Sequence, residues 1–197
     1  MDLADHKKMV AEYALSLGTD LSQAAFKVAE GHDRAPVMLV GYQLGPDETA
    51  PFTSESRHKL RSVLRQMRVG PGLLYLTNLI KIPSPVIVDQ ARCSSKWVDL
   101  LFQEIDAVEA RAVILLGMPV AGKVLKFGDD ALLDEFRRTR FQWPGRSKAN
   151  FFVTYGPEDV EMDDGVADIH GLNWLADLKA VFEVDAVHYD SVETVKD

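Results

Sequence analysis

The chain has few of the features that mark secreted and membrane proteins. Cys93 is the only cysteine among 197 residues, which excludes an internal disulfide framework and any metal or iron–sulfur site built from cysteines. The longest apolar stretch, residues 112–122, is well short of the roughly 20 residues needed to cross a bilayer. The first eight residues, MDLADHKK, lack the apolar core of a secretory signal. We therefore expect a cytoplasmic domain with no membrane association, no metal and no cofactor.

Basic residues are fewer than acidic ones. The chain has 22 Lys and Arg and 30 Asp and Glu, which gives a formal net charge of −8. Non-specific binding to nucleic acid depends on Lys and Arg that neutralise phosphates, so the overall charge does not favour it. The charges are unevenly distributed, however. Arg140, Arg146 and Lys148 belong to a basic group interleaved with aromatic residues, which makes them candidates for nucleic-acid backbone contacts. Six carboxylates lie within residues 158–168 and would repel such a backbone.

Short apolar runs alternate with helical patterns through most of the chain. Uninterrupted apolar runs predict buried parallel strands, and apolar residues at helical spacing predict helices between them. This alternation predicts an α/β fold of three layers, in which a four-stranded, mostly parallel sheet carries helices on both faces. The predicted strands are residues 36–40, 73–77, 112–116 and 151–155, and the predicted helices are residues 55–67, 94–108, 120–127, 132–136 and 171–182.

The sequence divides into three parts. Residues 1–34 hold two helical patterns, at 3–17 and 21–29, and we expect these helices to pack on the core. Residues 35–185 form the α/β domain. Residues 186–197 have the composition of a polar tail.

Ligands of parallel sheets bind beyond the carboxyl ends of the strands, so the residues after each predicted strand are candidate site residues. Gly41 and Gly45 follow the first strand and permit a turn in which backbone N–H groups approach a ligand. Asn78 follows the second strand and offers both a donor and an acceptor, which suits reading a nucleobase edge or an amide. The chain has neither a P-loop nor the Gly-x-Gly-x-x-Gly fingerprint, which argues against ATP or NAD binding.

Four motifs resemble those of the uracil-DNA glycosylase superfamily, most closely its family 4 branch. Their order and spacing hold from about residue 36 to residue 157. The resemblance implies the three-layer α/β/α fold of that superfamily. The matching segments are residues 37–41 followed by Gly45, Glu48, Pro51 and Phe52, similar to strand-Gly-Glu-Ala-Pro-Gly-x-x-Glu and Pro-Phe; residues 76–81, similar to strand-Thr-Asn-x-x-Lys; residues 112–117, similar to an apolar strand ending in Leu-Gly; and residues 152–157, similar to Thr-Tyr-His-Pro.

The resemblance implies a nucleobase pocket. Phe52 falls on the aromatic residue that stacks on a flipped uracil, and base–aromatic stacking contributes on the order of 1–3 kcal/mol. Asn78 falls on the residue that reads the pyrimidine edge through its side-chain amide. Lys81 falls on a segment that lies along the DNA in members of the family, so the resemblance implies that it contacts the nucleic-acid backbone. The implied base-binding set is completed by the neighbouring motif positions Tyr42, Gly156 and Pro157.

The positions expected to carry out catalysis depart from the family pattern. Tyr42 replaces the family 4 acidic residue, and Gln43 stands where other branches have Asp or Asn. A carboxamide can hold a water for attack on the sugar carbon but is not a strong base. Glu48, which matches a family position, is the second candidate for that role. Gly156 replaces the His that stabilises the leaving base, and the loss of such a donor costs roughly 10²–10³ in rate.

The iron–sulfur cluster of family 4 lacks its ligands in this sequence. Ile82 and Trp97 occupy the two interior cysteine positions, and Cys93 alone cannot hold a cluster. The resemblance therefore implies a cluster-free relative without a cofactor.

Two functions stay open at this point. In the first, the chain is a DNA glycosylase-like protein that binds a flipped or free pyrimidine and hydrolyses the N-glycosidic bond of uracil or a modified base. Its partner is then DNA or a nucleotide-type ligand. In the second, it is a catalytically silent module that binds a protein partner through residues 158–168. Phe52 and Asn78 also have structural interpretations, since the ring could staple the following helix onto the sheet and the amide could satisfy a turn.

Overall fold

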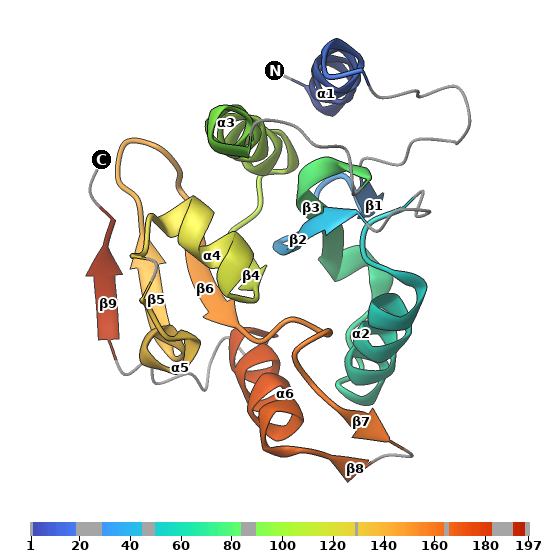
Figure 1. The fold of residues 1–197 in the computed structure, drawn as a ribbon. Helices are drawn as coiled ribbons and strands as arrows, with labels where there is room; N and C mark the ends of the chain where they lie inside the picture. The colour runs from blue at the N-terminus through green and yellow to red at the C-terminus, as the bar shows by residue number, and fades with distance from the viewer. Residues whose placement is uncertain are drawn as a thin grey trace.

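The computed structural model describes residues 2–18, 29–44, 50–83, 90–128, 130–163, 166–182 and 191–195, which form three layers (Figure 1). The seven strands of the sheet are β1 (Ala29–Gly31), β2 (Val37–Leu44), β3 (Leu74–Pro83), β4 (Ala112–Leu116), β5 (Thr139–Gln142), β6 (Asn150–Thr154) and β9 (Ser191–Thr194). Two further strands, β7 (Met162–Asp163) and β8 (Val166–Ala167), pair with each other. The helices are α1 (Leu3–Ser16), α2 (Ser54–Gln66), α3 (Gln90–Val108), α4 (Met118–Leu125), α5 (Leu133–Phe136) and α6 (Ile169–Phe182), with one 3₁₀ turn at Pro71–Leu73.

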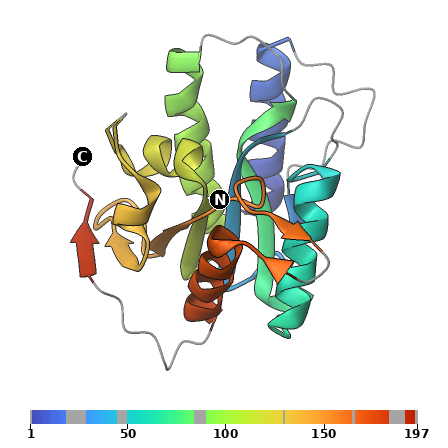
Figure 2. The same ribbon diagram turned by 60° about the horizontal axis from the view of Figure 1, so that its bottom comes forward.

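The sheet is covered by helices on both faces. Helices α1, α3 and α4 lie on one face, and α2 and α6 lie on the other (Figures 1 and 2). The residues of β2 alternate between the two layers of core. Val40 packs with Leu101 on the first face, whereas Leu39 packs with Trp174 on the second. Burial on both faces explains why this strand is an uninterrupted apolar run. No helix in the described part of the chain is long and apolar enough to span a bilayer.

The centre of the sheet is parallel, with the four strands in the order β3, β2, β4, β6. The predicted α/β class and the four predicted strands are therefore confirmed. Strands β2 and β3 run further than predicted, because their pairing continues through Gly41 with Asn78 and Gln43 with Ile80. Gly41, Asn78 and Lys81 thus lie inside strands rather than in loops after them. The polar residues had interrupted the apolar pattern without ending the strands.

Three strands flank this parallel centre and were not predicted. Strand β1 pairs antiparallel with β3, β5 pairs antiparallel with β6, and β9 pairs parallel with β5. Strand β1 starts at Ala29, the last residue of the second predicted helix, whose other residues lie outside the described ranges. Residues 191–194, within the segment expected to be a polar tail, form an edge strand. These segments are short and mostly polar, so they lack the apolar run that predicts a buried strand.

Helix α2 starts close to the carboxyl end of β2 and brings its first turn to that edge of the sheet. Thr53 caps the helix, since its hydroxyl accepts a hydrogen bond from the Ser56 backbone N–H at 3.1 Å. Leu60, Val63 and Leu64 form the buried stripe that holds the helix against the sheet. The polar first turn is consequently left facing outward beside β2.

Candidate functional site

A cleft of about 440 Å³ opens beside the carboxyl-terminal parts of β2 and β3. Its volume falls within the roughly 300–1,000 Å³ range of small-ligand sites. The carboxyl ends of neighbouring parallel strands are where ligands bind in such sheets. The walls come from β2, β3, the start of α2 and the loop after β6, namely Gly41, Tyr42, Gln43, Phe52, Thr53, Glu55, Ser56, Lys59, Asn78 and Glu158.

Gly41 is the point where the aromatic ring and the carboxamide of the cleft meet. A Cβ placed on Gly41 would lie 2.4 Å from Oδ1 of Asn78 and 2.7 Å from Cε1 of Phe52. Any side chain at this position would therefore displace one or both groups. The sequence-predicted residues Phe52 and Asn78 are thus brought together across a glycine, with Tyr42 and Gln43 beside them.

The Asn78 side chain is buried without a partner. It is only 2% exposed, and neither Oδ1 nor Nδ2 has a hydrogen-bond partner among the described residues. A buried polar group left unpaired costs about 1–3 kcal/mol. The carboxamide lines the cleft and is free to pair with a ligand, because it presents one acceptor and two donor hydrogens.

Phe52 is held in an unusual backbone conformation. Its φ of +66° lies in the left-handed region, which non-glycine residues rarely adopt. The Arg57 guanidinium on α2 donates a hydrogen bond to the Phe52 carbonyl at 2.9 Å and another to the Pro51 carbonyl at 3.3 Å. These bonds tie the residue to the helix, so both the ring and its strained backbone are fixed at the cleft wall.

Lys81 lies behind the cleft and not on a DNA-facing surface, so the expectation that it contacts a nucleic-acid backbone is wrong. The residue is 1% exposed, and its ammonium donates to Glu104 at 2.6 Å and to the Asn78 carbonyl at 2.8 Å. Glu104 is fully buried on α3 and also accepts hydrogen bonds from Tyr75 and Thr77. Burial lowers the pKa of Lys81, and the charge of Glu104 opposes that shift. This ion pair supports the backbone of Asn78 from within the core.

Gln43 and Glu48 are the two candidates for holding the attacking water, and the structure describes the position of the first. Gln43 lines the cleft and donates from Nε2 to the Ile82 carbonyl at 3.3 Å, which leaves its side-chain oxygen as an acceptor. Glu48 lies outside the described residues. Of these two residues, Gln43 is the one that the structure describes at the cleft.

The loop after β6 contributes Glu158, which the sequence analysis did not single out. Gly156 and Pro157 are buried and are not among the residues that line the cleft, whereas Glu158 is exposed and lines it. A Cβ on Gly156 would lie 2.9 Å from both Cδ and Oε1 of Glu158. The Gly156 N–H donates to the Asp159 carboxylate at 2.8 Å, which fixes the turn. The residue is exposed overall, but partial loss of water around its carboxyl group raises the pKa of Glu158.

Helix α2 supplies a cation that was also missed. Lys59 lines the cleft, and its ammonium donates to Glu55 at 3.0 Å and to the Val160 carbonyl at 3.1 Å. Thr53, Ser56 and Lys59 recur every three residues, so they share one face of the helix. That spacing is the signal by which the sequence could have identified them.

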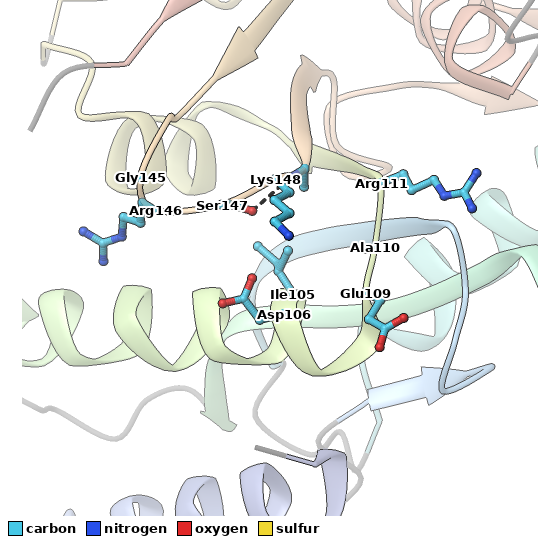
Figure 3. A pocket seen from close by; sticks show the side chains of 10 residues that line it. Ile105, Asp106, Glu109, Ala110, Arg111, Gly145, Arg146, Ser147 and Lys148 are labelled. Atoms are coloured by element: carbon cyan, nitrogen blue, oxygen red, sulfur yellow. Dashed lines mark hydrogen bonds between the residues drawn. The ribbon is translucent and has the colours of Figure 1, made fainter.

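Two of the basic residues proposed for nucleic-acid backbone contacts lie at the opposite edge of the sheet. Arg146 and Lys148 line a second cleft, of about 770 Å³, beside residues 110–111 and 149, which come directly before β4 and β6 (Figure 3). Lys148 points toward Ile105 there, whereas Arg146 points away and pairs with Asp99. This edge holds the amino ends of the parallel strands.

Arg140 is likewise distant from the first cleft. It lies in β5, which β4 and β6 separate from β2 in the order of the sheet. The three basic residues proposed for backbone contacts therefore do not surround Phe52 and Asn78.

The residues at the expected cluster positions do not fit an iron–sulfur cluster. Ile82 and Trp97 are each 1% exposed and pack in the apolar core, and neither side chain can ligate iron. Within the described ranges, no group of three or more His, Cys, Asp or Glu side chains is placed to hold a metal ion.

Comparison with known families gives one match. Residues 28–168 match the family model described as the Uracil DNA glycosylase superfamily. That span covers well over half of the chain and includes every residue named above as lining the first cleft. No curated protein matched the chain.

Proposed function

The chain belongs to the uracil-DNA glycosylase superfamily, and from that membership we propose that the cleft between Phe52 and Asn78 binds a pyrimidine base, either flipped out of DNA or free. The observation that carries the proposal is the Asn78 carboxamide, which is buried at the cleft and has no hydrogen-bond partner for either polar atom among the residues that the structure describes. Natural proteins rarely retain such a group without a function for it.

The chemistry of the two walls complements a pyrimidine. The edge of uracil presents an N–H donor beside a carbonyl acceptor, and a carboxamide offers the matching acceptor and donor side by side. The face of the Phe52 ring supplies stacking, which is worth about 1–3 kcal/mol for one base. This gain offsets part of the free energy needed to unstack a base from a nucleic acid strand.

The reaction that we propose is hydrolysis of the N-glycosidic bond of uracil or a modified pyrimidine in DNA. Gln43 holds the attacking water through its side-chain oxygen, and Glu48 is the second candidate for that role. A carboxamide orients water but accepts no proton at neutral pH, so we expect slow turnover compared with an enzyme that has a carboxylate base. The acidic residues after β6 favour a single-stranded over a duplex substrate, because a duplex brings more phosphates to the rim.

The test is a base-release assay on labelled oligonucleotides, single-stranded and duplex, that carry one uracil or modified pyrimidine each. Alkali then cleaves the strand wherever a base has been lost. We expect release from the wild type, with a large loss of rate in Asn78→Ala and Gln43→Ala. Arg146→Ala, at the opposite edge of the sheet, serves as the control and keeps the wild-type rate. No release from any substrate would contradict the catalytic part of the proposal.

One observation favours a second candidate, the catalytically silent module. Gly156 offers no side chain to stabilise a leaving base, and its backbone N–H is already taken by Asp159. In that case the wild type binds a uracil-containing oligonucleotide, loses affinity in Asn78→Ala, and releases no base. A protein partner would then be sought through the acidic residues 158–168, in which Glu161 is exposed.

A further inference from the structure

We propose that Glu158 is a catalytic residue of this cleft, which donates a proton to the pyrimidine as the N-glycosidic bond breaks. The inference rests on the proposed function. It assigns a proton donor to the departure of the base, a step for which the proposed function names no donor. A pyrimidine that leaves without a proton carries a negative charge, so a group that supplies one lowers the barrier.

Four side chains of the cleft can titrate, and three of them are poorly suited to this role. The Lys59 ammonium is engaged by Glu55 at 3.0 Å and by the Val160 carbonyl at 3.1 Å. Glu55 is paired with that lysine and is largely exposed. Tyr42 carries a phenol, which is chemically a weaker proton donor than a carboxylic acid. Glu158 remains as the acid of the cleft.

The position of Glu158 is set by the missing side chain two residues earlier. A Cβ on Gly156 would lie 2.9 Å from Cδ and Oε1 of Glu158, so the carboxyl group lies over the space that a larger residue at 156 would fill. Gly156 does not have a positive φ, and other residues are allowed there by the backbone. Gly156 therefore leaves a space beside its Cα, and the carboxyl group of Glu158 occupies that space.

The surroundings of Glu158 raise the pKa of its carboxyl group. Loss of water is the main cause that raises the pKa of the carboxyl, and the negative charge of Asp159 adds to it. A hydrogen bond from its own backbone and the positive charge of Lys59 on α2 oppose the shift. Tyr42 and Glu55 also line the cleft, from β2 and α2. A carboxyl that keeps its proton to a higher pH is a better donor near neutrality.

The bond between the sugar C1′ and the base nitrogen breaks, and its electron pair goes to the base, which takes the Glu158 proton. The water held by Gln43 forms a bond from its oxygen to C1′. The proton released by that water returns to the Glu158 carboxylate. The products are an abasic sugar and a neutral base, and the enzyme is regenerated.

The experiment measures single-turnover base release from a uracil-containing single strand between pH 5 and pH 9. We expect Glu158→Gln to lower the rate about 10²-fold, at the low end of what general acids contribute. The wild-type rate should fall as the pH rises through the pKa of Glu158, and this dependence should vanish in the variant. The matched control is Glu161→Gln, an exposed carboxylate three residues away, which should keep the wild-type rate and pH profile.

A rescue variant separates a catalytic role from a structural one. Glu158→Ala should greatly lower the rate of base release. The double variant with Gly156→His should be at least about tenfold faster than Glu158→Ala, because an imidazole can enter the vacated space and donate a proton. Affinity for the oligonucleotide, measured by anisotropy, should change only a few-fold in Glu158→Gln.

Two results would overturn the inference, and they differ in what they say of the proposed function. If Glu158→Gln matches Glu161→Gln in rate and pH profile while Asn78→Ala is inactive, Glu158 is not the acid and the proposed function stands. If the wild type releases no base from any substrate, the inference fails together with the proposed hydrolysis.

Discussion

Gly41 and Asn78 are register partners in the parallel strands β2 and β3, and a Cβ on Gly41 would lie 2.4 Å from Asn78 Oδ1. The same Cβ would lie 2.7 Å from Cε1 of Phe52, well inside the distance at which carbon atoms attract. The absence of a side chain at Gly41 therefore lets the Phe52 ring and the Asn78 carboxamide face one cleft.

Gly41→Ala should close the cleft to its ligand. We expect affinity for a uracil-containing single-stranded oligonucleotide to fall at least about tenfold, a loss of about 1.4 kcal/mol, because the ring and the amide are displaced. Fluorescence anisotropy measures the affinity, and thermal unfolding checks the fold. Gly72→Ala is the matched control, since a Cβ there meets no atom within 4 Å. Equal affinities of the two variants would contradict the prediction.

Phe52 should contribute to ligand affinity through stacking on the face of its ring, and not only through the space that its side chain fills. Phe52→Leu keeps an apolar side chain in the core but removes the stacking surface, and we expect a loss of affinity of about tenfold to a hundredfold. Phe52→Tyr keeps the ring and should bind within a few-fold of the wild type. The same titration decides between the two roles, because a residue that only staples α2 to the sheet would leave Phe52→Leu with wild-type affinity.

The ion pair between Lys81 and Glu104 should stabilise the fold as a unit. Lys81→Met leaves the Glu104 charge buried without its cation, and we expect the free energy of unfolding to fall by about 3–5 kcal/mol. Adding Glu104→Gln removes that charge while keeping an acceptor for Tyr75, so the double variant should regain part of the loss. Urea denaturation of the wild type, the two single variants and the double variant measures these changes in the free energy of unfolding. Additive losses would show that the two residues act independently.

His6 should make the protein less stable in mild acid. Its ring is fully buried on α1, its Nε2 lies 4.0 Å from Glu104, and neither nitrogen has a hydrogen-bond partner within the described ranges. Burial lowers the pKa of His6, although the charge of Glu104 opposes the shift. Between the lowered pKa and the unfolded value of about 6.5, the unfolded chain binds more protons than the folded one. Stability is therefore fully present above about pH 6.5 and declines as the pH falls through that window.

His6→Leu tests this dependence. Urea denaturation at pH 7.5 should show equal or slightly greater stability than the wild type, because two unpaired ring nitrogens are removed. At pH 5.5 the variant should lose less of its stability than the wild type does. Parallel declines in both proteins would assign the acid sensitivity to other groups.

The parallel centre of the sheet could be predicted because each of its strands is apolar on both faces. Leu39 and Val40, for example, pack in opposite layers, so both had to be apolar. Strands β5 and β9 carry polar residues such as Arg140 and Glu193 on short segments, and only pairing with a neighbouring strand determines their structure. The ends of β2 and β3 were misplaced for a related reason, since Gly41 and Asn78 interrupt an apolar run without ending the strand.

The site was predicted in part. Phe52, Asn78 and Gln43 were identified from motif positions, and they do line one cleft. Lys81 was misassigned because its partner Glu104 lies 23 residues away, and a sequence pattern does not reveal that two such charges are buried together. Glu158 was counted only as part of an acidic run, because its approach to Gly156 depends on how the loop after β6 turns back.

The most direct test of the account follows the Asn78 side chain by NMR as a ligand is added. The amide signals of Asn78 in the ¹⁵N-labelled protein are assigned by their absence in Asn78→Asp, and a short single-stranded oligonucleotide containing uracil is titrated in. We expect a saturable shift of these signals that weakens in Phe52→Leu, because the carboxamide pairs with a base held against the ring. Saturation of the protein with unchanged Asn78 signals would contradict the claim that this residue reads the base.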